Sequence, residues 1–357
     1  MIAAEFDVQR RRDGQVTARR MGSDGATRLL CLAIALAATG CADTPADEPL
    51  IGRFDYAIAQ SRALVYGDGL ATVVATESFS YAADGLPLQS VRSRLTAEGS
   101  IEPDARLAWT YDDVGRPLRL DYTIEVGGTW RDSARLTWTW SADRLTEYGS
   151  EVPTPSGAWR ADERYLLDYD DAGRTAAVTR QVSNAEGVWR GTNRTRITWD
   201  ANGRVTERQL EYGSAENWYP NQSERWIWEE PGRLAQIETG WQNGVRWQAQ
   251  QIRRFELTAT GALAAVVELV DSWRNGRRDW RAVNRTNYAR DAAGRVVGVE
   301  NQQKQGWDGP WQTVSGTALS LTAGTSRGSE RLAWGMWSPL HEEMLSRHGD
   351  VWVRAAP

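Results

Sequence analysis

The chain has few of the residues that most often carry metal or nucleophilic chemistry. Its 357 residues include two cysteines, Cys31 and Cys41, and two histidines, His341 and His348. No cysteine follows residue 41, so a disulfide cannot stabilise the remainder of the chain. The two histidines are seven residues apart, which does not match the usual i, i+4 spacing of zinc ligands on a helix. We therefore expect no metal and no other cofactor.

Long hydrophobic runs are also scarce. Nothing after Cys41 is apolar for long enough to span a membrane as a helix. The run LLCLAIALAA at 29–38 is shorter than the ~20 residues that a spanning helix needs. It has the length of the apolar core of a signal peptide and follows a basic stretch that ends at Arg28. The run ends in Ala38-Thr39-Gly40-Cys41, which resembles the lipobox of bacterial lipoproteins.

The lipobox resemblance implies that Cys41 is lipidated and becomes the first residue of the mature protein. Ala38 stands where the family usually has leucine, and Ala42 stands where aspartate would retain the protein at the inner membrane. The resemblance thus implies a lipid-anchored envelope protein and favours the outer membrane in a Gram-negative cell. Ordinary secretory cleavage and a buried helix are the alternatives. Translation starts at Met1 or at Met21, which opens a leader of ordinary length.

The charge pattern bears on possible partners. The net charge is −5, and no long basic stripe follows the leader. Because nucleic-acid binding depends on a positive surface, nucleic acid is not an expected partner. The expected partners are the membrane, through the lipid, and an envelope protein or glycan that the sequence does not identify.

The abundant residues recur with a regular period. The chain has 33 glycines, but 19 tryptophans against four phenylalanines. Turn sequences return at intervals of 28 to 33 residues. They are Gly52-Arg53, Gly85-Leu86, Gly115-Arg116, Asp143-Arg144, Gly173-Arg174, Gly203-Arg204, Gly232-Arg233, Gly261-Ala262 and Gly294-Arg295. Such self-similarity is typical of a repeat architecture.

Each repeat has the pattern of a β-hairpin. In YDDVGR at 111–116, the aspartate can accept a backbone N–H and the glycine can adopt positive φ, as a tight turn requires. Before the turn, Leu107, Trp109 and Tyr111 alternate with smaller or polar residues, and the alternation resumes after it. A period of two indicates a half-buried strand. The arginines five residues before several turns, such as Arg106, should therefore lie on the face opposite the pre-turn aromatics.

These patterns predict an all-β fold: an antiparallel meander of about eight hairpins of ~30 residues, forming a long curled sheet, spiral or closed. The expected divisions are a signal peptide at 1–40, a lipidated cysteine and linker at 41–50, a repeat domain at 51–322 and a C-terminal cap at 323–357. Within the cap, residues 338–346 read as a short helix, with Ser338 as the N-cap and Pro339 at the first position.

The turn motifs resemble a known family. YDDVGRPL at 111–118 and YDDAGRTA at 169–176 are similar to the YD repeats of RHS-type proteins. The resemblance extends as a pattern over about residues 50 to 312, although tryptophan often replaces tyrosine and the repeat is longer than the RHS unit. It implies a coiled sheet, because RHS repeats spiral into a β-shell.

A ladder of tryptophans supplies the candidate ligand-binding residues. These residues recur near the turns opposite the Gly-Arg pairs: Trp130, Trp159, Trp189, Trp218, Trp247, Trp280 and Trp311. Their flat rings could stack on sugars, which is the functional interpretation. Repetition in every unit favours the structural interpretation, in which the rings pack between strands.

The chemistry available to an enzyme is limited. The turn aspartates have a structural role, and glycoside hydrolysis would need two carboxylates converging in one concavity. We therefore expect a non-enzymatic binding or scaffold lipoprotein. A carbohydrate-binding envelope protein and a polysaccharide-acting enzyme are the two alternatives.

Overall fold

A computed structural model describes residues 54–326, apart from short gaps at 68–69, 143, 185, 215–216, 230–232, 244–245, 260–261 and 275–276. The predicted leader, Cys41 and the predicted helix at 338–346 lie outside the described residues. The described residues form eighteen strands. Among them, no helix is long and apolar enough to cross a membrane.

The strands follow one another at short intervals. They are β1 (Phe54–Gly67), β2 (Leu70–Tyr81), β3 (Pro87–Leu95), β4 (Ile101–Tyr111), β5 (Pro117–Val126), β6 (Thr129–Ser141), β7 (Arg144–Pro153), β8 (Trp159–Tyr169), β9 (Thr175–Ser183), β10 (Trp189–Trp199), β11 (Val205–Ser214), β12 (Asn217–Glu229), β13 (Arg233–Asn243), β14 (Arg246–Leu257), β15 (Leu263–Arg274), β16 (Arg277–Arg290), β17 (Val296–Lys304) and β18 (Trp311–Ser326).

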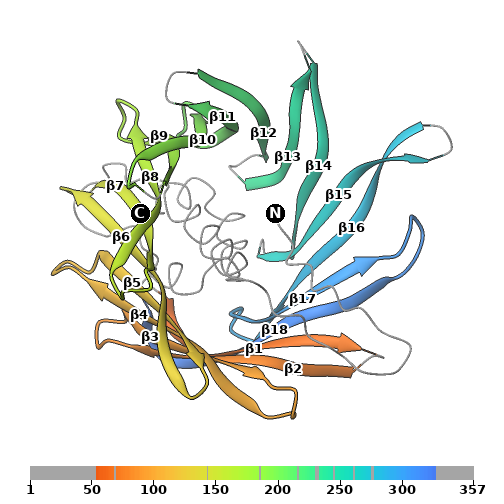
Figure 1. Cartoon of the computed structure of the whole chain (residues 1–357). Helices are drawn as coiled ribbons and strands as arrows, with labels where there is room; N and C mark the ends of the chain where they lie inside the picture. Colours follow the sequence, from red (N-terminus) through yellow and green to blue (C-terminus); the bar gives the residue numbers. More distant parts are fainter. Residues whose placement is uncertain are drawn as a thin grey trace.

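The strands close into a barrel. Each strand pairs antiparallel with its neighbours in the chain, and β1 also pairs with β18. This last ladder runs from the pair Phe54↔Ser326 to the pair Val65↔Ser315. Figure 1 shows β18 and β1 side by side in the ring of strands. Near the join, Tyr66 packs over Gly316, where a Cβ would lie 3.4 Å from the tyrosine ring.

The closed barrel corrects the predicted fold. A long curled sheet of about eight hairpins, coiled like an RHS shell, was wrong: one closed sheet of eighteen antiparallel strands is present. The turn motifs mark eight hairpin tips, but β1 and β18 lie outside that series and pair with each other. Closure removes two unpaired edges from a sheet that is too wide to remain open without curling or splitting.

The turns form two rims. We call the end with the eight turns from β2–β3 to β16–β17 the Gly-Arg rim, and the end with the nine turns from β1–β2 to β17–β18 the tryptophan rim. At the Gly-Arg rim, Gly115 has φ +87° and its N–H donates to Asp112 O at 3.0 Å. Gly85, Gly173, Gly203 and Gly294 also have positive φ. Glycine is therefore required here by the backbone geometry.

The two faces of the sheet differ in chemistry. Trp109 lies opposite Leu120, and Leu120 lies opposite Leu136, so these side chains share one face. Their buried cluster continues through Trp138 and Leu145. A second cluster lies farther around the same face, at Ile197, Val205, Trp226, Leu234, Ile237, Phe255, Leu263, Val266, Tyr288 and Val296. We call this side the apolar face and the other side the arginine face.

Bulges in the middle of the strands change which face a side chain occupies. In the β5–β6 ladder, Tyr122 pairs with Ala134 but Thr123 pairs with Asp132. The extra residue shifts the alternation, so that Trp130 comes to the same face as Arg106. A strict period of two does not predict this, because a bulge is not visible in the alternation itself.

Candidate functional site

The Gly-Arg rim is built from an aspartate and an arginine in each full turn motif. Asp170 Oδ1 accepts the N–H groups of Ala172 at 3.0 Å and of Arg174 at 2.8 Å. Its Oδ2 accepts from Arg174 Nε at 2.8 Å. Equivalent Asp–Arg pairs occur at 112/116, 200/204 and 291/295. The motif therefore ties each turn to itself.

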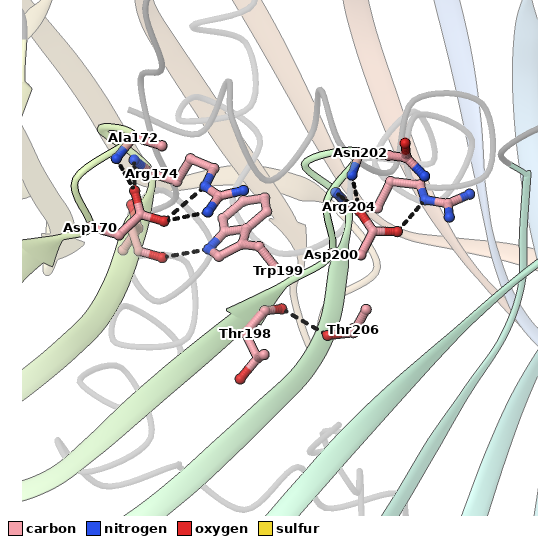
Figure 2. A network of polar contacts seen from close by, with 10 residues as sticks. Asp170, Ala172, Arg174, Thr198, Trp199, Asp200, Asn202, Arg204 and Thr206 are labelled. Atoms are coloured by element: carbon pink, nitrogen blue, oxygen red, sulfur yellow. Dashed lines mark hydrogen bonds and ion pairs between the residues drawn. The ribbon is translucent and has the colours of Figure 1, made fainter.

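The same arginine also contacts the next hairpin. The Arg174 guanidinium lies 5.5 Å from the centre of the Trp199 ring, and Trp199 Nε1 donates to Thr175 O at 3.0 Å. Figure 2 shows this group beside its neighbour around Asp200 and Arg204. Arginine–aromatic contacts repeat at 116/140, 144/169 and 204/228. Bonds from the aromatic to a main-chain carbonyl repeat at 111/87, 140/117, 169/145 and 228/205.

These contacts explain the repeat consensus. The aromatic before the turn bonds to the preceding hairpin, the aspartate closes its own turn, and the arginine covers the next aromatic. A hairpin that carries the aromatic, the aspartate and the arginine is therefore held on both sides at this rim. In the last full copy of the turn motif, an arginine replaces the aromatic residue before the turn. Arg290 stands at that position, and its Nη2 donates to Leu263 O at 3.0 Å.

The ion pairs change the acidity of the turn aspartates. Burial acts to raise the pKa of Asp112, Asp170 and Asp200, but hydrogen bonds and ion pairing from the arginine of the same turn hold the pKa below its usual range. For Asp291, the side-chain hydrogen bond from Arg295 lowers the pKa. These aspartates are ionised at neutral pH and engaged in the turn.

Polar pairs interrupt the apolar face at mid-barrel. Glu163 is 2% exposed and lies 2.6 Å from Arg180 Nη2. Glu77 accepts from Ser90 Oγ at 2.6 Å, and burial raises the pKa of Glu77. Burial also lowers the pKa of Arg208, whose guanidinium lies 5.0 Å from the Trp226 ring centre. The charged groups on this face are therefore mostly engaged with other side chains.

The seven candidate tryptophans lie near the starts of the even-numbered strands from β6 to β18, at the tryptophan rim. All are partly buried. An arginine from the preceding even strand lies over five of them, in the pairs 106/130, 135/159, 164/189, 194/218 and 225/247, at 4.0 to 5.0 Å from the ring centres. Lys304 lies 5.8 Å from the Trp311 ring centre. Trp280 and Trp311 also pack against the cluster of Ile252, Val267 and Leu269.

Three aromatic residues that the sequence reasoning missed have more exposed side chains than the seven tryptophans. Tyr212 is 48% exposed, Tyr219 67% and Trp241 43%. They lie on β11, β12 and β13 toward the tryptophan rim. The signal available in the sequence was that they belong neither to the pre-turn aromatics nor to the tryptophan ladder, so the repeat does not account for them.

The described residues offer limited means for metal or acid–base chemistry. Among them, no group of three or more His, Cys, Asp or Glu side chains is placed to hold a metal ion. A hollow of about 370 Å³ near the Gly-Arg rim is lined by Glu229, Gln236, Arg254, Phe255 and three further residues. Glu229 is the one carboxylate among its lining residues.

Comparisons with known proteins yield distant structural neighbours. No family model matches the chain, and no curated protein matches it. A porin-like protein from Bacteroides uniformis is 11% identical, with 74% of this chain and 98% of that chain covered and a TM-score of 0.38. The Tc holotoxin pore of Photorhabdus luminescens is 12% identical over 72% of this chain and 15% of that chain, with a TM-score of 0.26. Likeness at this level does not bear on function.

Proposed function

We propose that this chain is a lipid-anchored, non-enzymatic module of the bacterial cell envelope, in which the barrel is a rigid scaffold for binding. The observation that carries the scaffold role is the Gly-Arg rim, where turn ion pairs, guanidinium–ring contacts and aromatic-to-backbone bonds link successive hairpins. The lipobox at Cys41 supports the anchor. The barrel starts at β1, a short distance in the sequence after that cysteine.

The tryptophan ladder supports the scaffold interpretation over sugar stacking at those seven positions. A guanidinium already lies over the ring in five of them, for example Arg135 at 4.0 Å from the Trp159 ring centre. Stacking of this kind favours a fixed ring orientation and contributes about 0.5–1 kcal/mol at exposed sites. The tryptophan ladder thus joins neighbouring hairpins at the tryptophan rim.

The anchor is tested by Cys41→Ser, with Cys31→Ser as the matched control in the same leader. We expect Cys41→Ser to release the protein from membranes or to leave the leader uncleaved, whereas Cys31→Ser is processed and fractionates normally. The measurements are membrane fractionation and the mass of the mature N-terminus. A Cys41→Ser protein that still fractionates as a mature, membrane-anchored species would overturn the proposal.

A further inference from the structure

The exposed aromatic residues gather in one place. Twelve large hydrophobic side chains are exposed among the described residues, and the three aromatic ones are Tyr212, Tyr219 and Trp241. They lie on three successive strands, β11 to β13. Exposed aromatic rings cost solvation free energy, so their concentration on one part of the surface indicates a binding role.

The strand register places the three rings on one face. Tyr212 pairs with Tyr219 across the β11–β12 ladder, so their Cβ atoms are about 5 Å apart. On β13, Ile237, Thr239 and Trp241 are every second residue, so Trp241 shares the apolar face with Ile237. On β11, Arg208 lies opposite Ile197 of the apolar face, and Tyr212 lies four residues farther along, so Tyr212 is on the same face. Along β12, Tyr219 lies roughly 10 Å nearer the tryptophan rim than the point that faces Trp241. The rings form a strip rather than a single stack.

The residues directly opposite Tyr212 and Trp241 on the outer strands are uncharged and polar, and the basic Arg246 lies on the same face, two residues from Gln248. Asn193 lies opposite Tyr212 on β10, and Gln248 lies opposite Trp241 on β14. The nearest acid on β11, Glu211, points to the arginine face and pairs with Arg194 at 2.7 Å. Amide groups beside flat, amphipathic rings can bind a ligand that has both apolar C–H faces and many hydroxyl groups.

We propose that Tyr212, Tyr219 and Trp241 form a binding platform for an uncharged glycan chain. The pyranose C–H faces stack on the rings, and the sugar hydroxyls bond to Asn193 and Gln248. The elongated strip contacts more than one sugar of the chain. This inference rests on the proposed binding role of the barrel, but it does not depend on the lipid anchor.

The test is calorimetric titration of the full chain in detergent with uncharged hexasaccharides of glucose (α-1,4 and β-1,4) and of N-acetylglucosamine, and with an acidic polyuronate as the charged comparison. We expect saturable binding of at least one of them. Trp241→Ala and Tyr219→Ala should each weaken that binding by about tenfold, because an exposed ring can be removed without loss of the fold. Trp159→Ala, at an arginine-covered ring, is the matched control and should leave the affinity unchanged.

Several outcomes would overturn the proposal. They are no binding of any of these hexasaccharides, binding unaffected by the platform variants, or binding of an acidic polyuronate alone. A change from dimer to monomer in Tyr219→Ala, seen by light scattering, would assign the strip to contact with a second copy instead. Because purified protein is titrated, failure here is distinct from failure of the anchor, which membrane fractionation of Cys41→Ser reports.

Discussion

The two rims of the barrel use the same residue types in different ways. At the Gly-Arg rim, the aromatic side chains donate to main-chain carbonyls, as Trp199 does to Thr175 O at 3.0 Å. At the tryptophan rim, the indoles are held mainly by side chains, as Trp189 is by Arg164 at 4.4 Å from the ring centre. A main-chain acceptor fixes the hairpin itself, whereas a long arginine side chain can adjust. The exposed strip of Tyr212, Tyr219 and Trp241 lies toward the tryptophan rim.

The largest expected difference between the rims comes from removing a ring. Trp138 on the apolar face is 5% exposed and packs in a buried cluster. Trp138→Ala should lower the free energy of unfolding by about 3–5 kcal/mol, because it leaves a cavity. Trp159→Ala, at a partly buried position of the tryptophan rim, should cost about 1–2 kcal/mol. Urea denaturation of both variants measures the difference, and equal losses would contradict it.

A smaller change isolates the main-chain bond. Trp199→Phe keeps an aromatic ring but removes the donor to Thr175 O. We expect a loss of about 1–2 kcal/mol in the free energy of unfolding, because a partly buried carbonyl loses its partner. Trp189→Phe at the other rim should cost less than about 0.5 kcal/mol by the same assay. A loss at Trp189 as large as that at Trp199 would show that the rims are equivalent.

Acid should weaken the Gly-Arg rim selectively. The pKa of Asp112, Asp170 and Asp200 is lowered in the folded state. Their contribution to the free energy of unfolding is therefore fully present above the unfolded-state pKa, near 3.9. It is lost as the pH falls through the lower folded pKa. The raised pKa of Glu77 acts in the opposite direction, since burial disfavours its charged form.

The prediction is that the melting temperature falls between about pH 5 and pH 2. The fall should be shallower in the triple variant Asp112→Asn, Asp170→Asn and Asp200→Asn. An asparagine side chain at each turn could still accept the two backbone N–H bonds, but it could not form the ion pair. A triple variant with an unchanged pH profile would rule out the turn aspartates as its source.

A small effect is also expected from a single cation over a ring. Arg106 lies 4.3 Å from the centre of the Trp130 ring. Arg106→Met keeps an apolar stem but removes the charge, and should cost about 0.5–1 kcal/mol. Arg204→Met also breaks the pair with Asp200 at 2.7 Å and should cost more. Equal unfolding free energies for the two variants would mean that the turn ion pair adds nothing to the Gly-Arg rim.

Local chemistry in the sequence was sufficient to predict the hairpins. The Asp-x-x-Gly-Arg motif determines the tight turn through short-range bonds, as at Asp170 and Arg174. The placement of Arg106 on the face opposite the pre-turn aromatics follows from alternation. The exposed strip was not predicted, because the exposure of Tyr219 depends on which neighbours cover it. The predicted lipidation at Cys41 and the predicted helix at 338–346 remain predictions.

The sequence by itself therefore determined the repeat unit: where the chain turns, which residues alternate and why glycine, aspartate and arginine recur. Each of these depends on contacts within about 30 residues of chain. The tertiary structure alone decided that the sheet closes. The pairing of β1 with β18 joins segments at opposite ends of the array, and the repeat pattern is the same in a spiral and in a barrel. It also decided which rings are covered, because bulges and neighbouring strands set that exposure.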